Sequence, residues 1–127
     1  MRIETYEAGD VVVVPFPFTD RQSAKRRPAL VVSSCSSFNS LSGHAVLAMI
    51  TSEKNAPWPL DTVIDDLDSA GLPSPSRVRM KLFTLDQRLI IRKAGRLADF
   101  DRTNVGEAIA ALLAAGTNAD NSAIMPR

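Results

Sequence analysis

A chain of 127 residues can form one domain with a modest hydrophobic core, but not two, so we expect a single domain over residues 1–127. Its hydrophobic share of 45% is ordinary for a soluble protein, and no apolar run is long enough to cross a membrane. With 15 Lys and Arg against 14 Asp and Glu, the net charge is only +1, so any affinity for nucleic acid must come from where the cations lie.

The N-terminus and the one cysteine indicate the compartment. Acidic residues, Glu4 and Glu7, occur where a secretory signal would need its apolar region, so we expect a cytoplasmic protein. Cys35 has no second cysteine with which to form an intramolecular disulfide. Whether Cys35 is a reactive thiol is left open by the sequence.

Short strands dominate the predicted secondary structure. A β-branched run at Val11–Val14, stopped by Pro15 and Pro17, predicts the first strand, and the polar segment 19–27 predicts a loop that carries function. Further strands are predicted at Ala29–Ser33, His44–Ile50, Leu60–Asp66, Ser76–Leu85 and Leu89–Leu97, with serine-rich and Gly/Pro-rich loops at 33–43 and 68–75. For Leu89–Leu97 a short helix is the alternative. We expect His44–Ile50 to be central, because residues pointing to both of its faces are apolar and both faces should be buried. Leu60–Asp66 is expected to be an edge strand.

The strand Ser76–Leu85 has the clearest alternation. Its odd-numbered residues Arg77, Arg79 and Lys81 share one face, whereas Val78, Met80 and Leu82 share the other. One face therefore packs on the core. The other is a row of cations, which is either a substrate groove or an ordinary solvated surface.

The end of the chain switches to helical spacing. Asp99 is the predicted N-cap of an amphipathic helix that Gly116 ends, and residues 117–127 are expected to be a flexible tail. Several strands followed by a late helix indicate a mainly β, α+β fold with its core over residues 9–115.

A set of short motifs, in a fixed order, resembles the PemK/MazF family of toxin endoribonucleases from bacterial toxin-antitoxin pairs. The opening Gly-Asp and strand are followed by Pro-Phe-Pro-Phe-Thr-Asp at 15–20, Arg-Pro at 27–28, Ile-Thr-Ser at 50–52 and Lys-Leu-Phe-Thr-Leu-Asp at 81–86. The resemblance covers about residues 9–115, and its strength lies in the order of the motifs.

The resemblance implies both a fold and an activity. The fold is a small SH3-like barrel, shared with the gyrase poison CcdB, that forms homodimers. The activity is sequence-selective cleavage of single-stranded messenger RNA without a metal or other cofactor, in which the ribose 2′-hydroxyl attacks the adjacent phosphate and leaves a 2′,3′-cyclic phosphate. The implied partner is an antitoxin, with which such toxins bind DNA, whose acidic or hydrophobic segment covers the cationic groove.

The same resemblance assigns site residues. Arg27, before the strand-opening proline, and Thr51, at the end of the third predicted strand, match the family's catalytic arginine and threonine, and the nuclease hypothesis requires their side chains to meet. Arginine suits charge stabilisation better than proton abstraction, so Asp20 is the preferred base, ahead of Glu53 and the lone His44. The predicted RNA-binding residues are Phe18, Thr19, Lys25, Arg26, Ser52, Arg77, Arg79 and Lys81.

Other features of the sequence leave alternatives open. Some family members carry a histidine in the loop after the first strand and an aspartate after the arginine of the fifth, and this chain has neither. A CcdB-like protein that grips gyrase, or a catalytically silent relative that only binds RNA or an antitoxin, would fit the same fold. We expect the aromatic residues Phe16, Phe18 and Trp58 to belong to the core or an interface, although Phe18 could stack a base.

Overall fold

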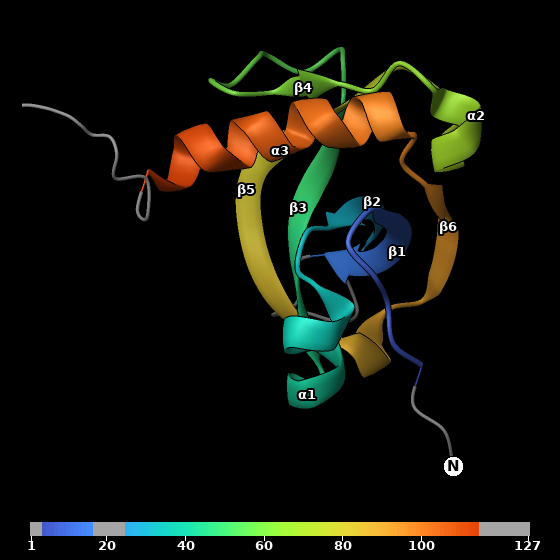
Figure 1. The fold of residues 1–127 in the computed structure, drawn as a ribbon. Coiled ribbons are helices and arrows are strands. Elements are labelled where there is room, and N and C mark those ends of the chain that lie inside the picture. The colour runs from blue at the N-terminus through green and yellow to red at the C-terminus, as the bar shows by residue number, and fades with distance from the viewer. Residues whose placement is uncertain (1–3, 17–24, 115–127) are drawn as a thin grey trace, which may run out of the picture.

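A six-stranded antiparallel sheet is the central element of the part of the chain that is described, residues 4–16 and 25–114 of this computed structural model (Figure 1). The strands are β1 (Asp10–Phe16), β2 (Lys25–Val31), β3 (His44–Ser52), β4 (Thr62–Val63), β5 (Ser76–Asp86) and β6 (Arg92–Arg96). They lie in the order β4-β5-β3-β2-β1-β6 and curl into a half-barrel, which confirms the mainly β fold, with β3 central and β4 at an edge as expected.

Short helical segments connect the strands. They are a π-helical turn (Cys35–Asn39), α1 (Ser40–Ser42), α2 (Leu67–Ala70), a 3₁₀ turn (Gln87–Leu89) and the long α3 (Asp99–Leu113). Among the described residues, no helix is both long and apolar enough to cross a membrane.

Several predicted boundaries were wrong for physical reasons. The serine-rich segment is helical rather than a loop, because the Ser34 side chain accepts a hydrogen bond from the Ser37 N–H at 3.1 Å. β2 begins at Lys25, since pairing with β1 extends it through the arginines, and the predicted last strand opens as the 3₁₀ turn. Ala98, not Asp99, occupies the N-cap of α3 and makes no side-chain cap. Gly116 and the predicted tail lie outside the described residues.

The sheet packs on both faces. One face carries an apolar cluster shared with α3, including Val11, Leu30, Val78 and Val105. The opposite face carries a second cluster formed by residues of the other parity, among them Val14, Ala29, Leu47 and Leu85. Alternation along the strands thus decides on which side of the sheet each polar side chain emerges.

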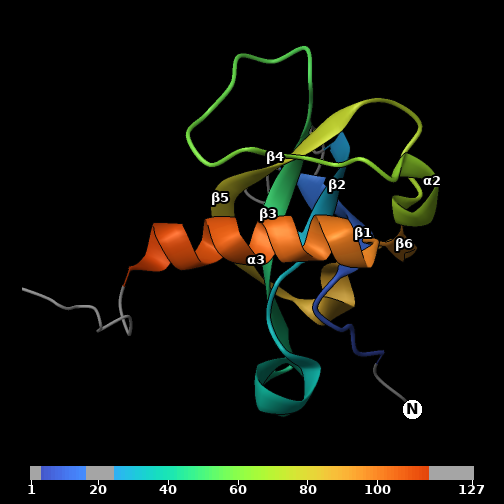
Figure 2. The same cartoon turned by 45° about the horizontal axis from the view of Figure 1, so that its top comes forward.

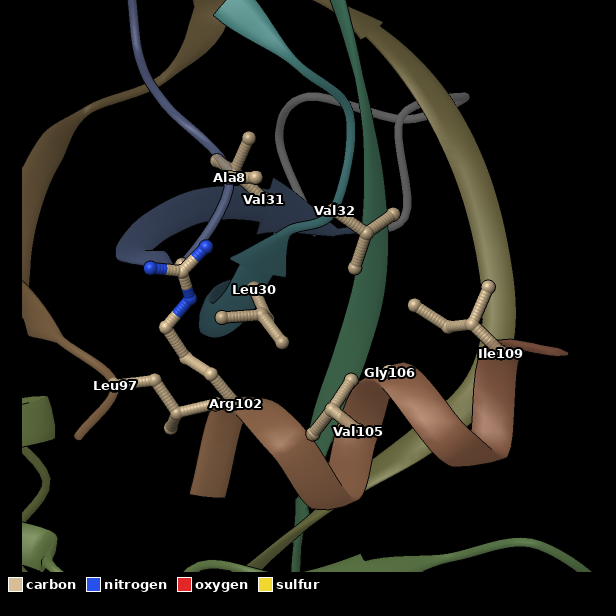
Figure 3. Close-up of a pocket in the computed structure, with 10 residues that line it drawn as sticks. Ala8, Leu30, Val31, Val32, Leu97, Arg102, Val105, Gly106 and Ile109 are labelled. Atoms are coloured by element: carbon tan, nitrogen blue, oxygen red, sulfur yellow. The ribbon is translucent and has the colours of Figure 1, made fainter. Parts of the chain in front are cut away.

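A small cavity of about 130 Å³ remains between α3 and the end of β2 (Figure 3). Its lining is mostly apolar, with the guanidinium of Arg102 reaching across it from α3. The Arg102 side chain makes no recorded polar contact with the described residues, but packs over Gly9.

The buried carboxylate of Asp101 fastens α3 to the chain before α2. Asp101 lies in the first turn of α3 and is 1% exposed. Its two carboxylate oxygens accept hydrogen bonds from the N–H groups of Asp65 and Asp66, each at 3.0 Å. We expect Asp101→Ala to lower the free energy of unfolding by about 2–4 kcal/mol, because two hydrogen bonds to a charged group are lost. Urea denaturation measures the loss.

The exposed Asp99 offers a matched control, because it shares the first turn of α3 but accepts no such side-chain bond among the described residues. Asp99→Ala should cost less than about 1 kcal/mol, the usual size of a helix-dipole interaction. Equal losses in the two variants would contradict the role of Asp101.

Candidate functional site

Proline in β2 opens the sheet beside the predicted catalytic pair. β2 and β3 pair from Val31–Leu47 to Ala29–Met49, and no pair is recorded beyond. The next residue of β2 is Pro28, which has no N–H to donate to a ladder. Continuing the antiparallel register by two residues on each strand reaches Arg27 on β2 and Thr51 on β3. The two residues therefore face each other where the strands separate.

A cavity of about 230 Å³ occupies this opening. Both Arg27 and Thr51 line it, together with Arg79 and Lys81 of β5 and the aromatic rings of Phe16 and Trp58. Arg27 has the same parity as Ala29, so the cavity continues the face of the sheet opposite α3. Three cationic residues and one hydroxyl thus line the same cavity, a composition suited to a phosphate group.

The hydroxyl of Thr51 is oriented by a neighbour. Its Oγ1 accepts a hydrogen bond from Nδ2 of Asn55 at 2.6 Å. Because a hydroxyl has one proton to donate besides its acceptor sites, this bond leaves the proton available for another acceptor. Thr51 can thus donate to an oxygen bound in the cavity.

An irregularity in β5 sets the positions of Arg79 and Lys81. Ala48 pairs with Leu82 and Ile50 with Val78, so two steps along β3 correspond to four along β5. The extra residues of β5 lie at Arg79–Lys81, beside the cavity. Bulges of this kind redirect side chains and often flank functional sites.

Arg79 holds the β3–β4 loop, residues 53–61, which extends beyond the sheet at the top of Figure 2. Its Nε and Nη2 donate to the two oxygens of Asp61 at 3.2 and 2.9 Å, and Nη2 also donates to the Ala56 carbonyl at 2.7 Å. The guanidinium carbon lies 4.7 Å from the ring centroid of Trp58. Arg79 thus fixes the indole at the edge of the cavity.

The ionisation of Asp61 supports this arrangement. Burial would raise the pKa of Asp61, but the hydrogen bonds from Arg79 and from the Trp58 N–H, with the charges of Arg79 and Arg77, outweigh it and hold the pKa below the ordinary value of 3.8. Asp61 therefore remains an anion at neutral pH and neutralises part of the charge of the two arginines.

Because the folded pKa of Asp61 is depressed, its contribution to loop attachment is complete above its ordinary value of 3.8 and is lost as the pH falls through the lower folded value. Trp58 is the only tryptophan, so its fluorescence reports on the loop. We expect constant emission from neutral pH to about pH 4, with a change only in more acidic solution. Asp61→Asn should shift the neutral-pH emission toward that of the acid form; an unchanged acid transition in this variant would contradict the assignment.

The other predicted RNA-binding residues that the structure describes are not among those that line this cavity. Arg77 donates to the carbonyls of Asn55 and Glu53, both at 3.1 Å, and so helps to hold the loop. Arg26 lines a different cavity, Ser52 lines another, and Lys25 is exposed at the start of β2. Three predicted residues, Phe18, Thr19 and Asp20, fall outside the described residues.

The two alternative bases do not reach the cavity. Glu53 lines the same separate surface cavity as Ser52. His44 starts β3 while Thr51 is near its end, so about 23 Å of strand separate them at roughly 3.3 Å per residue. Neither a carboxylate nor an imidazole is among the described residues that line the cavity.

Trp58, Asn55 and Asp61 are the site residues that the sequence did not reveal. Of the two places predicted for Trp58, the core or an interface, the core is wrong, because the residue is 45% exposed and lines the cavity. Phe16 also lines the cavity, where Nζ of Lys81 lies 5.4 Å from its ring centroid. The available signal was the lone tryptophan between two prolines, since an aromatic residue bounded by prolines is not expected inside a strand.

Comparison with known proteins gives the family. The sequence profile of the PemK-like, MazF-like toxin of type II toxin-antitoxin systems matches residues 7–113. The chain belongs to this family. Its toxins are generally endoribonucleases. A search of curated proteins finds no match.

Solved structures of MazF toxins share the fold. A MazE-MazF complex from Deinococcus radiodurans aligns with a TM-score of 0.70 at 22% identity, covering 87% of this chain and 98% of that one. MazF alone from the same organism gives 0.68 at 21%, covering 88% and 99%. An endoribonuclease in complex with its cognate antitoxin, from a mycobacterial species, gives 0.68 at 15%, covering 88% and 96%.

Proposed function

We propose that this toxin is a metal-independent endoribonuclease that cleaves single-stranded RNA, with messenger RNA in the cytoplasm as its substrate. The observation that carries the proposal is the shared cavity of Arg27 and Thr51, two residues distant in the chain that match the family's catalytic motifs. The further cations and exposed aromatic ring around them suit a phosphate and a base, respectively.

The proposed reaction is transesterification. The 2′-oxygen attacks the neighbouring phosphorus, the bond from phosphorus to the 5′-oxygen breaks, and a 2′,3′-cyclic phosphate remains. Negative charge grows on the non-bridging oxygens, where the guanidinium of Arg27 stabilises it and the Thr51 hydroxyl donates a hydrogen bond. Arginine keeps its proton, so the proton of the 2′-hydroxyl goes to another group, for which we propose Asp20. The departing 5′-oxygen takes up a proton from solvent water and becomes the 5′-hydroxyl of the second product.

We propose that the exposed ring of Trp58, at the edge of the cavity, contributes to substrate selection. Stacking on Trp58 would hold an unpaired base, and Arg79 and Lys81 would hold the backbone. Charge-dominated contacts of this type predict binding that weakens as salt rises.

The proposed partners are an antitoxin and a second copy of the chain. The antitoxin complexes among the structural neighbours support the first. A disordered segment with acidic residues would pair with the cations of the cavity and become ordered on binding, so it would exclude RNA from the same surface.

The decisive experiment incubates the purified protein with a long RNA in the presence of a chelator and identifies the ends at each cut. We expect cleavage at a limited set of sites, leaving 2′,3′-cyclic phosphate and 5′-hydroxyl ends. No cleavage, or cuts that leave 5′-phosphates, would overturn the proposal. Cleavage that persists undiminished in Arg27→Ala would overturn the role of this arginine.

A further inference from the structure

A second cationic cavity lies beside the first, on the other side of the sheet. It has a volume of about 240 Å³ and is lined by Arg26 and Arg92 above an apolar surface that includes Pro28, Leu72 and Pro73. Arg27 lines this cavity as well as the first, so the two are neighbours that share one residue.

Strand register builds one wall of the second cavity. Val13 of β1 pairs with Pro28 of β2 on one side and with Arg92 of β6 on the other. Residues paired directly across strands share a face, so these three form a row across the sheet. Arg26 precedes Pro28 by two residues and therefore shares its face of the sheet. The Arg27 side chain, one residue along the strand, belongs to the opposite face.

Close backbone contact fixes the opposite wall. A Cβ atom on Gly71 would come within 2.1 Å of the Ala94 carbonyl oxygen, and one on Gly95 within 2.5 Å of the Ser69 oxygen. The segment after α2 is therefore locked against β6, and Leu72, 8% exposed, is anchored in the core. The cavity is consequently formed before any ligand arrives.

The charge in this cavity is not neutralised from within. None of its lining residues is acidic, and the side chains of Arg26 and Arg92 have no recorded hydrogen bond or ion pair with the described residues. Their neighbours on β6 differ: Lys93 and Arg96 both pair with Asp10, at 3.1 and 2.8 Å. Among the described residues, Arg92 is therefore the cation of β6 that has no acidic partner.

We propose that this second cavity binds a nucleotide of the RNA that flanks the scissile phosphate. Arg26 and Arg92 contact its phosphate, and the proline and leucine surface carries its base or ribose. Arg27 lies where the RNA passes from the first cavity to the second. This inference rests on the proposed nuclease function and extends it from the reacting phosphate to the length of RNA that the protein grips.

The test compares Arg92→Gln and Arg26→Gln with the wild type on two RNAs that carry the same mapped cleavage site. One RNA is the shortest that is cleaved, and the other is extended at both ends. Binding is measured on extended RNA with a 2′-deoxyribose at the cut, which removes the nucleophile. Arg102→Gln is the matched control, since it removes one exposed arginine from the cavity under α3 (Figure 3).

Each variant should raise KM for the extended RNA about tenfold, as expected for a lost charge-assisted contact, with kcat on the shortest RNA unchanged. The slope of log affinity against log salt should fall by about 0.7, the value for one phosphate contact to a single strand. Arg102→Gln should change neither, and all variants should melt at the wild-type temperature.

Other results separate the two proposals. If the wild type cleaves and both variants match it on extended RNA, the second cavity is not a nucleotide site, although the nuclease function stands. If the wild type cuts no RNA, both proposals fall. Weaker binding of poly-glutamate with unchanged binding of RNA would overturn this inference and assign the cavity to an acidic polypeptide.

Discussion

Replacing Arg27 with glutamine is expected to reduce kcat for RNA cleavage by about 10²–10³-fold, the usual cost of removing one donor from developing oxyanion charge. Glutamine keeps much of the length and polarity but removes the charge. Arg27→Lys should fall between, because lysine restores the charge without the planar fork. Single-turnover cleavage of a defined RNA measures each variant.

The control for Arg27 is Arg102→Gln, which makes the same change in net charge on the helix that packs against the other face of the sheet. Because Arg27 is exposed and its side chain has no recorded polar contact with the described residues, its loss should leave the melting temperature unchanged. A kcat within a few-fold of the wild type would exclude Arg27 from the chemistry.

Removing the indole of Trp58 should weaken RNA binding by about 5- to 100-fold in Trp58→Ala, since stacking contributes about 1–3 kcal/mol per base. The kcat at saturating RNA should change much less, because this ring lies at the wall of the cavity and does not supply charge to the phosphate. Binding to the 2′-deoxy RNA and the ratio of KM to kcat together measure the effect.

Two further variants make the prediction for Trp58 specific. Trp58→Phe keeps an aromatic face and should retain most of the affinity. Phe38→Ala removes another exposed aromatic residue, 37% exposed in the π-helical turn, and should have no effect. If Trp58→Ala binds RNA as the wild type does, or Phe38→Ala loses as much, the ring is not a stacking platform.

Local pattern was enough for part of the fold. Alternation placed Val78, Met80 and Leu82 of β5 on one face, and they do pack together in the cluster under α3. Helical spacing found α3, but Asp99 lies inside the helix and Ala98 occupies the N-cap. The carboxylate that fixes the helix, Asp101, instead accepts from the distant backbone N–H groups of Asp65 and Asp66. Spacing within a segment carries no information on such long-range bonds.

The site was less accessible to sequence reasoning. Motif order singled out Arg27 and Thr51, but the bulge that aims Arg79 and Lys81 arises from a mismatch between two strands and has no signature in either alone. In the sequence, Asp61 is one of four aspartates between positions 61 and 68 and has no feature that links it to Arg79. In the folded protein its carboxylate lies 2.9 Å from the Arg79 guanidinium. Arg79 therefore anchors the β3–β4 loop and is not a free cation.

The way in which that loop is attached separates two properties of the protein. Arg77 and Arg79 hold it largely through main-chain carbonyl groups of Glu53, Asn55 and Ala56, which every amino acid provides. Apart from Asn55, which orients the Thr51 hydroxyl, and Asp61, which pairs with Arg79, side chains of the loop can therefore be exchanged while Arg27 and Thr51 remain in place. In the nuclease that we propose, a change of RNA preference through this loop would thus leave the reacting groups untouched.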